Sequence, residues 1–149
     1  MIYLSDKELK RAHAQDAGLD LVTTQVYELN GESVDNTLPC VLHAGDTAKI
    51  GTGLRVCIDD GYVGLLFPRS STAASGLLVH TGVIDAGYLG EIKIVVSCLS
   101  KEFKIEKGQR LAQLIIQRVY IDTLEPATLE EWQGLASARG ECGFGSSGT

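Results

Sequence analysis

The sequence predicts an all-β fold, either a sandwich or a jelly-roll-like barrel, made of many short strands. Three observations indicate it. Apolar and polar residues alternate over short runs, turn residues separate these runs at fairly regular spacing, and segments with a helical period are scarce. Strands of this kind bury one face and expose the other, as antiparallel sandwiches and barrels require. At 149 residues, the chain is long enough for one domain with its own core.

Alternation is clearest in residues 91–99, EIKIVVSCL, where Ile92, Ile94, Val96 and Cys98 fall on one face. The opposite face of this predicted strand is mostly polar. Further strands are predicted by alternation or by runs of β-branched and other apolar residues at residues 54–59, 62–67 and 110–121.

Turns are predicted between the strands by glycine next to Asn, Asp, Ala or Lys. They fall at Asn30-Gly31, Ala44-Gly45-Asp46, Asp59-Asp60-Gly61 and Lys107-Gly108. Two short helices are expected where Ser or Thr precedes Glu by three residues, because this pair can form a capping box. The pairs are Ser5 with Glu8 and Thr128 with Glu131.

The composition changes after Trp132, where small residues and glycine take over. A stretch of this kind at a chain end is typical of a mobile segment beyond a folded body. We therefore expect a barrel domain over residues 1–134 and a flexible C-terminal arm over residues 135–149.

The net charge of −6 limits the partners of the chain. Binding to duplex nucleic acid requires Lys and Arg to neutralise phosphates, so no stable nucleic-acid binding is expected, whereas one small phosphorylated ligand remains compatible with this charge. No signal peptide and no apolar run of membrane-spanning length are found. We expect an intracellular protein, in the cytoplasm or nucleus or in an infected host cell, with no membrane partner.

The four cysteines, Cys40, Cys57, Cys98 and Cys142, form no CxxC pair, and no nearby histidine completes a zinc-binding spacing. We expect reduced and mostly buried thiols, as in a reducing compartment; disulfides are the alternative.

Five stretches carry residue types that a fold alone does not need. In DAGLDL, residues 16–21, Asp16 and Asp20 flank small and apolar residues. A carboxylate near a turn can hold Mg²⁺ directly or through water, because Mg²⁺ prefers oxygen ligands and retains several waters. The alternative is an Asx turn that leads into a strand.

The second stretch is PRSSTAASG, residues 68–76, in which Arg69, Ser70 and Ser71 offer hydrogen-bond donors and small residues follow. Backbone N–H groups can then approach an anion closely, so the stretch is a candidate phosphate nest. It is not a P-loop, because no GxxxxGK[ST] is present. An ordinary polar loop between strands is the alternative.

The third stretch is GVIDAGYLGEI, residues 82–92, which predicts two strands joined by a tight hairpin. Asp85 and Tyr88 would lie near its bend. An Asp beside apolar residues can act as a general base toward water, and a Tyr ring can contact a sugar or base. The alternative is an ordinary turn Asp with a Tyr packed nearby.

In the fourth stretch, KGQRLAQLII, residues 107–116, Gln113 interrupts an apolar strand and must find partners, either backbone groups or a ligand.

The fifth stretch is the C-terminal RGECGFGSSGT. Arg139 can clamp a phosphate, Phe144 can stack on a base, and Ser146 and Ser147 add hydroxyls between flexible glycines. A disordered Gly/Ser end is the alternative, although a plain linker has no use for a ring.

Taken together, the five stretches supply what the hydrolysis of a nucleoside triphosphate needs. In order and spacing they resemble the five motifs of the homotrimeric dUTPase family (deoxyuridine 5′-triphosphate nucleotidohydrolase). GVIDAGYLG and RGECGFGSSG carry the most specific resemblance, which covers nearly the whole chain. The compact loop between PRSS and GVID is typical of the viral or phage type.

The resemblance implies a distorted, jelly-roll-like β-barrel that assembles as a homotrimer with three shared active sites. One subunit would supply the first, second and fourth motifs of a site, a second subunit the third motif, and the third subunit its C-terminal arm. The implied reaction is the Mg²⁺-dependent hydrolysis of dUTP to dUMP and pyrophosphate. This reaction limits uracil incorporation into DNA and supplies dUMP for dTMP synthesis.

The resemblance also implies roles for single residues. Asp85 would activate the water that attacks the α-phosphorus, and Asp20 would bind Mg²⁺ through water. Tyr88 would lie under the deoxyribose and exclude a 2′-hydroxyl, while backbone groups around Val83 and Ile84 would read the uracil edge. The phosphate chain would be held by Arg69, Ser70, Ser71 and Gln113. The arm would close the site with Arg139, Phe144, Gly145, Ser146 and Ser147.

Three positions depart from the family pattern. Cys142 stands where glycine is usual, and its Cβ restricts the backbone of the arm. Ser147 stands where threonine is usual but keeps the hydroxyl. Gln109 replaces an acidic residue at an expected turn.

Two other functions compete. A dCTP deaminase-like relative on the same fold would use a catalytic Glu in the hairpin region and lack the GFGS arm, and this chain has Asp85 and the arm instead. A regulatory nucleotide-binding module would contact protein partners. Residues 28–39, a polar loop, would be its natural surface, although no feature of the sequence points to such a partner.

Overall fold

The computed structural model of the chain describes residues 1–137, apart from the side chains of residues 35–37. This part forms short strands and two short helices, α1 (Ser70–Ala74) and α2 (Leu129–Gln133). The strands are β1 (Ile2–Leu4), β2 (Leu19–Val22), β3 (Gln25–Leu29), β4 (Glu32–Thr37), β5 (Cys40–His43), β6 (Thr47–Gly51), β7 (Arg55–Cys57), β8 (Tyr62–Pro68), β9 (Leu77–Val79), β10 (Gly82–Ile84), β11 (Lys93–Cys98), β12 (Glu102–Ile105) and β13 (Arg110–Arg118).

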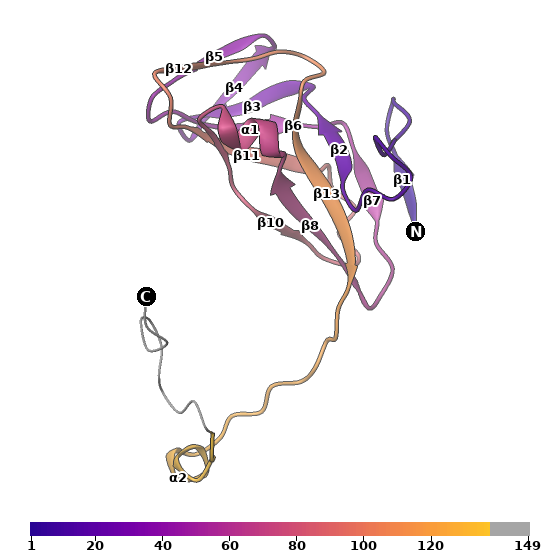
Figure 1. Cartoon of the computed structure of the whole chain (residues 1–149), viewed down its shortest axis with the longest axis vertical. Helices are drawn as coiled ribbons and strands as arrows, with labels where there is room; N and C mark the ends of the chain where they lie inside the picture. Colours follow the sequence, from indigo (N-terminus) through magenta and orange to yellow (C-terminus); the bar gives the residue numbers. More distant parts are fainter. Residues whose placement is uncertain (138–149) are drawn as a thin grey trace.

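Two larger sheets make up the body of a distorted, jelly-roll-like β-barrel (Figure 1). One has the order β4-β3-β6-β11-β9 and the other has the order β10-β8-β13-β2, while β1-β7 and β12-β5 form two-stranded ribbons. The pairings in these sheets are antiparallel. The fold class that the sequence predicts is thus confirmed.

The core lies between the sheets and follows the alternation of the sequence. Ile92, Ile94, Val96 and Cys98 are all at most 1% exposed, and β11 pairs with β6 on one side and β9 on the other. The apolar residues of the predicted strand at 54–59 are also buried. Burying a Val or Ile side chain contributes about 1.5–3 kcal/mol, so this periodicity decides which face of each strand turns inward.

The helix predictions have different outcomes. The capping box at α2 is confirmed: Glu131 N donates to Thr128 Oγ1 over 3.2 Å, and Thr128 N donates to Glu131 Oε2 over 2.7 Å. The prediction for Ser5 and Glu8 is wrong, because no helix forms there. Ser5 Oγ instead accepts from Lys7 N over 3.2 Å, a local turn bond that competes with helix formation. Helix α1 replaces the loop expected after Pro68.

The predicted hairpin over residues 82–92 is also wrong. β10 pairs with β8, whereas β11 pairs with β6 and β9 in the other sheet. Residues 85–92 are therefore a crossing segment between the two sheets, and its turn is closed by Tyr88 N donating to Asp85 O over 3.2 Å. The turn signal of the sequence is real, but each strand finds a partner that is distant along the chain.

The described cysteines agree with the expectation of reduced, mostly buried thiols. Cys40, Cys57 and Cys98 are free; Cys40 and Cys98 are buried and Cys57 is half-buried. Burial raises the pKa of the Cys40 thiol, with a further contribution from the nearby Asp46 carboxylate. Cys142 lies outside the described residues. Among residues 1–137, no helix is long and apolar enough to cross a membrane.

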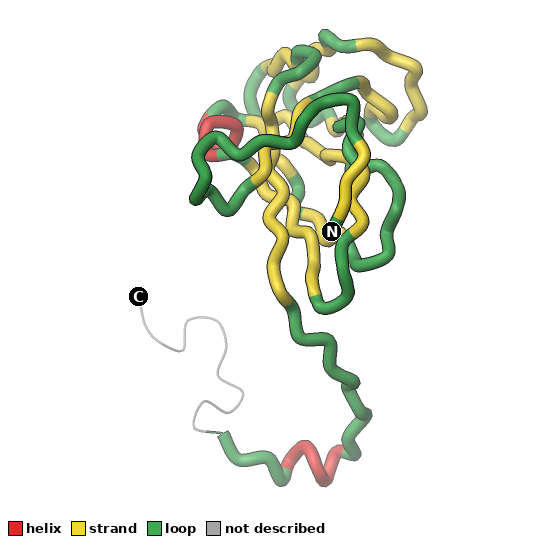
Figure 2. The backbone as a smooth tube through the Cα atoms, turned by 90° about the vertical axis from the view of Figure 1, so that its right-hand side faces the viewer, coloured by secondary structure: helices red, strands yellow, loops and turns green. Residues whose placement is uncertain are grey.

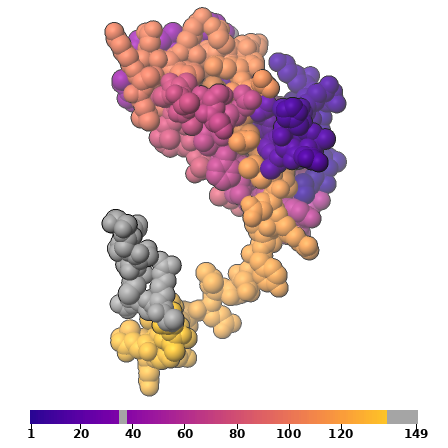
Figure 3. Space-filling model, viewed as in Figure 1, coloured from indigo at the N-terminus to yellow at the C-terminus, as the bar shows by residue number. Residues whose placement is uncertain are grey.

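The chain leaves the barrel after β13 and runs away from it toward α2 (Figures 1 and 2). Apolar side chains along this segment are open to solvent in the single chain: Tyr120 is 95% exposed, Leu124 is 94% exposed and Trp132 is 63% exposed. The space-filling view shows this part standing apart from the barrel (Figure 3). A row of exposed apolar residues of this size is typical of a surface that another chain covers.

The two faces of β5 should differ in their contribution to stability. Leu42 is 0% exposed and its neighbour Val41 is 45% exposed. We expect Leu42→Ala to cost about 2–5 kcal/mol of unfolding free energy, because it leaves a cavity in the core. Val41→Ala, the matched control, should change it by about 0.5 kcal/mol or less. Urea unfolding at one chain concentration measures both, and equal losses would contradict the assignment of the faces.

Candidate active site

A polar pocket of about 340 Å³ opens where β2, β13 and the start of α1 meet. It is lined by Ala12, Asp16, Gly18, Asp20, Arg69, Ser70, Ser71 and Gln113. Three stretches that the sequence analysis singled out separately, at residues 16–21, 68–76 and 107–116, are thus brought together. We call this cavity the polar pocket.

The strand register positions these side chains. β13 pairs with β2 on one side and with β8 on the other, and Gln113 lies opposite Asp20 on β2 and opposite Phe67 on β8. Directly opposed residues of an antiparallel pair project from the same face, so Asp20 and Gln113 reach the same side of the sheet. Arg69 is the residue directly after β8. Its backbone N–H donates to Leu111 O on β13 over 3.3 Å, which ties it to that strand.

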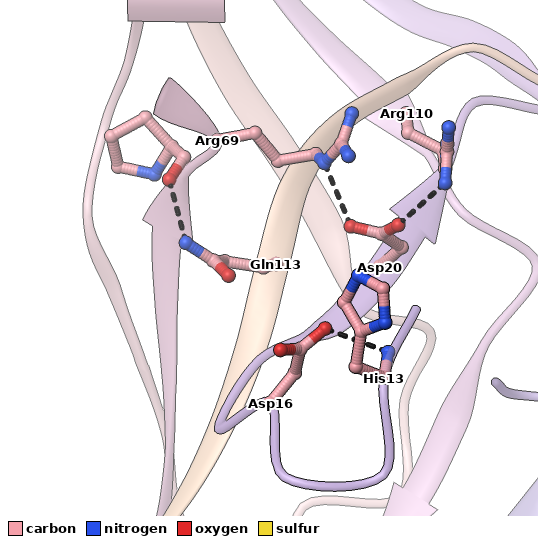
Figure 4. A network of polar contacts seen from close by, with 7 residues as sticks. His13, Asp16, Asp20, Arg69, Arg110 and Gln113 are labelled. Atoms are coloured by element: carbon pink, nitrogen blue, oxygen red, sulfur yellow. Dashed lines mark hydrogen bonds and ion pairs between the residues drawn. The ribbon is translucent and has the colours of Figure 1, made fainter. Parts of the chain in front are cut away.

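The carboxylate of Asp20 binds two arginines (Figure 4). Its Oδ1 lies 2.8 Å from Arg69 Nε, and its Oδ2 lies 3.0 Å from Arg110 Nη1. The Asp20 side chain is only 18% exposed, so solvent screens these ion pairs less than those of a fully exposed carboxylate. The two ion pairs fix the orientation of the carboxylate and of the Arg69 guanidinium at the pocket wall.

Gln113 finds the backbone partner that its half-buried position requires. Its Nε2 donates to Pro68 O over 3.0 Å, and its carbonyl lies against Gly18, where an added Cβ would be 2.0 Å from Oε1. An amide has two N–H donors, so one of them remains for a ligand. Asp16 holds the neighbouring turn, since its carboxylate accepts from His13 N over 2.8 Å (Figure 4). This bond reaches back three residues, so it closes the turn before Asp16 and is not the Asx turn into the strand that was the alternative.

A second cavity, of about 350 Å³, lies beside the crossing segment. We call it the loop pocket. It is lined by Lys49, Val83, Ile84, Asp85, Tyr88, Glu91, Ile92, Lys93 and Val95. Here the structure places the third predicted stretch, with Val83 64% exposed and Tyr88 45% exposed at its rim.

Glu91 anchors the crossing segment to the barrel. Its Oε2 accepts from Tyr27 Oη over 2.7 Å, and its Oε1 accepts from Gly53 N over 2.8 Å. The hydrogen bond with Glu91 raises the pKa of Tyr27, with smaller contributions from burial and the charge of the carboxylate. The ammonium of Lys93 lies 4.4 Å from the centroid of the Tyr27 ring, a cation–π distance.

The polar pocket and the loop pocket share no lining residue. On one chain, Asp85 and Tyr88 are therefore in a different cavity from Asp20, Arg69, and Gln113. The predicted arm residues Arg139, Phe144, Gly145, Ser146 and Ser147 lie outside the described residues. The site residues thus form two groups in the part of the chain that the structure describes.

Sequence reasoning missed two residues that the geometry makes central. Arg110 is an ordinary basic residue at a strand start until β13 is paired with β2, which brings it to Asp20. Glu91 ends a turn in the sequence, and only the fold reveals its bonds to Tyr27 and Gly53. The sequence carries no signal for Arg110, because a residue three positions before Gln113 falls on the opposite face of a regular strand, and the register irregularity between Arg110 and Ala112 appears only in the structure.

Comparison with known proteins gives a consistent result. The family model described as dUTPase matches residues 6–148. The deoxyuridine 5′-triphosphate nucleotidohydrolase of Mycolicibacterium gilvum is 43% identical over 93% of this chain and 85% of its own length. The protein of the same name from Nocardia farcinica is 42% identical over 93% of this chain and 76% of its own length.

Solved structures of phage enzymes are similar as well. A mutant dUTPase of Staphylococcus bacteriophage 80alpha, solved with dUpNHpp, superposes with a TM-score of 0.80 and 30% identity over 96% of this chain and 92% of that chain. A mutant dUTPase of phage phi11 of S. aureus, whose structure reveals the coordination of a structural Mg(II) ion, has a TM-score of 0.69 and 26% identity over 81% of this chain and 89% of that chain. The chain described here belongs to the dUTPase family.

Proposed function

We propose that this chain hydrolyses dUTP to dUMP and pyrophosphate with the help of Mg²⁺. The observation that carries the proposal is the polar pocket, in which Asp20, Arg69 and Gln113 converge from three distant stretches of a chain that belongs to the dUTPase family. In this proposal the enzyme limits uracil incorporation into DNA and supplies dUMP for dTMP synthesis.

The polar pocket suits a chain of phosphates. Arg69 presents a guanidinium that Asp20 already orients, so little side-chain freedom is lost when it binds an anion. Ser70 and Ser71 bring hydroxyl and backbone donors at the start of α1, and Gln113 adds its remaining N–H. Donors held in place before the substrate arrives are the basis of electrostatic stabilisation in phosphoryl chemistry.

The pocket fits an Mg²⁺ ion held through water. Its lining has the carboxylates of Asp16 and Asp20 against the one guanidinium of Arg69, so a triphosphate entering it needs added positive charge. No group of three His, Cys, Asp or Glu side chains that could hold a metal occurs in the described part of the chain. Asp20 retains acceptor capacity beside its two ion pairs, because a carboxylate has about four acceptor positions. Bound Mg²⁺ supplies charge neutralisation and orients the phosphates.

Asp85 is the proposed general base. It lies in the loop pocket next to the apolar Ile84 and holds its place at the turn through its carbonyl, which accepts from Tyr88 N. In this proposal its carboxylate takes a proton from the water that attacks the α-phosphorus. Backbone groups around Val83 and Ile84 read the uracil edge, and the ring of Tyr88 lies under the deoxyribose.

A homotrimer would complete the site. The two pockets have no residue in common. In a trimer, the loop pocket of one subunit, with Asp85, can therefore face the polar pocket of another subunit. The exposed apolar side chains between Val119 and Leu135 support such contacts, since they have no cover on the single chain. Residues 135–149 are the proposed arm, in which Arg139 reaches the γ-phosphate and Phe144 covers the uracil, while Gly145, Ser146 and Ser147 complete the lid.

Pyrophosphate release from dUTP tests the proposed function. The full chain should release pyrophosphate rapidly from dUTP in the presence of Mg²⁺, slowly from dCTP, dTTP and UTP, and not after chelation of the metal. A chain that ends at Ala138 should lose at least about 100-fold in kcat/KM, because the lid excludes water and aligns the groups. Release of ammonia from dCTP would show a deaminase instead. Nucleotide binding without turnover would show a regulatory module.

Asp85→Asn should separate chemistry from binding. The amide keeps the size of the side chain but cannot take the proton of the attacking water, and loss of a general base lowers a rate by about 10²–10⁴-fold. We expect kcat to fall within this range while the dissociation constant for dUTP changes little, as measured by calorimetry with a non-hydrolysable analogue. Near-normal turnover would refute the assignment of the base.

A further inference from the structure

The ring of Tyr88 occupies the space that a side chain at position 90 would need. A Cβ added to Gly90 would lie 2.3 Å from Tyr88 Oη, 2.4 Å from Cζ and 2.8 Å from Cε2, and Cβ atoms essentially never show contacts under 3.0 Å. The end of the ring is thus folded back over the backbone of its own turn. Only glycine at position 90 permits this placement.

A hydrogen bond holds the ring in this placement. Tyr88 Oη donates to Glu91 O over 3.1 Å. The same residue, Glu91, is fixed to the barrel through its carboxylate, which accepts from Tyr27 Oη and Gly53 N. The residue that accepts from the Tyr88 hydroxyl is therefore tied to β3 through Tyr27 and to the loop between β6 and β7 through Gly53. The ring has a defined seat even though it is 45% exposed.

We propose that Gly90 and Glu91 are positioning residues for sugar specificity: they seat the Tyr88 ring so that it excludes a 2′-hydroxyl. This inference rests on the proposed function, in which Tyr88 lies under the deoxyribose. Neither Gly90 nor Glu91 need touch the substrate. Both residues act on the Tyr88 ring: Gly90 leaves room for it because it has no Cβ, and the backbone carbonyl of Glu91 accepts its hydrogen bond.

Exclusion of a hydroxyl depends on a rigid wall. A hydrophobic pocket rejects an analogue that merely adds a hydroxyl by only about 100-fold, because the added group is small. A ring that is free to tilt would make room for the ribose of UTP. A ring held at its edge by a hydrogen bond and packed on Gly90 cannot tilt without losing both contacts.

The substitution Gly90→Ala should act on the ring rather than on the backbone. The backbone at Gly90 lies outside the left-handed region, whereas its neighbour Gly87 has φ +83°. Alanine is therefore compatible with the backbone of position 90. The clash falls on the far end of a half-exposed side chain, which can move without disturbing the core.

The experiment compares kcat/KM for dUTP with kcat/KM for UTP in four chains: unmodified, Gly90→Ala, Tyr27→Phe and Val41→Ala. Val41→Ala is the control, because Val41 is 45% exposed on β5 and lines neither the polar pocket nor the loop pocket. We expect Gly90→Ala to lower the dUTP/UTP ratio at least about tenfold, with a Tm close to that of the unmodified chain. Tyr27→Phe, which removes one anchor of Glu91, should lower the ratio by a smaller factor, and Val41→Ala should leave it unchanged.

An unchanged ratio in Gly90→Ala would overturn the inference, as would an equal loss of activity on both nucleotides, which would point to a role in folding or chemistry. An unchanged ratio in Tyr27→Phe alone would remove Glu91 from the account. These results are distinguishable from failure of the proposed function, which would appear as an absence of dUTP hydrolysis in the unmodified chain and would overturn both.

Discussion

The pairing of β13 with β2 and β8 is the constraint on which the polar pocket depends. Its register puts Gln113 opposite both Asp20 and Phe67, residues that are far from it and from each other along the chain. The same pairing brings Arg110 to Asp20 and fastens Arg69 beside Leu111. A slip of β13 by one residue would turn its own side chains, Gln113 among them, to the other face of the sheet, so the buried Leu111, Ala112 and Leu114 fix the position of Gln113 as well as the core.

The charge of the polar pocket explains why a metal belongs to the proposed reaction. Asp20 is bound by two arginines, yet only one of them, Arg69, lines the cavity, and Asp16 adds a second carboxylate. In the proposed reaction, the pocket would therefore orient an anion but leave much of its charge unneutralised. A triphosphate that arrived with its own cation would resolve this imbalance, since the cation would supply the missing charge and Asp20 would need only to accept hydrogen bonds from its water.

The sequence predicted what local patterns determine and missed what distant pairing determines. The alternation around Ile94 predicted the buried face of β11, and the Thr128–Glu131 pair predicted α2. The turn at Ala86-Gly87 was read correctly as a turn but wrongly as a hairpin, because the partner of β10 is β8 and nothing within residues 82–92 encodes that choice. For the same reason the sequence did not predict the roles of Arg110 and Glu91, because each meets its partners only when segments that are distant along the chain come together.

The central claim is that each active site combines the polar pocket of one subunit with the loop pocket of another. Mixing two inactive variants, each defective in a different pocket, tests it directly, because some sites in the mixed trimers would combine two intact pockets. A chain with Arg69→Ala lacks a working polar pocket and a chain with Asp85→Asn lacks a working loop pocket. Unfolded together and refolded at equal amounts, they should regain about a quarter of the wild-type rate of dUTP hydrolysis, since one site in four would combine the two intact halves in a randomly assembled closed trimer. Each variant refolded alone should stay inactive. No recovery in the mixture would contradict a site shared between subunits.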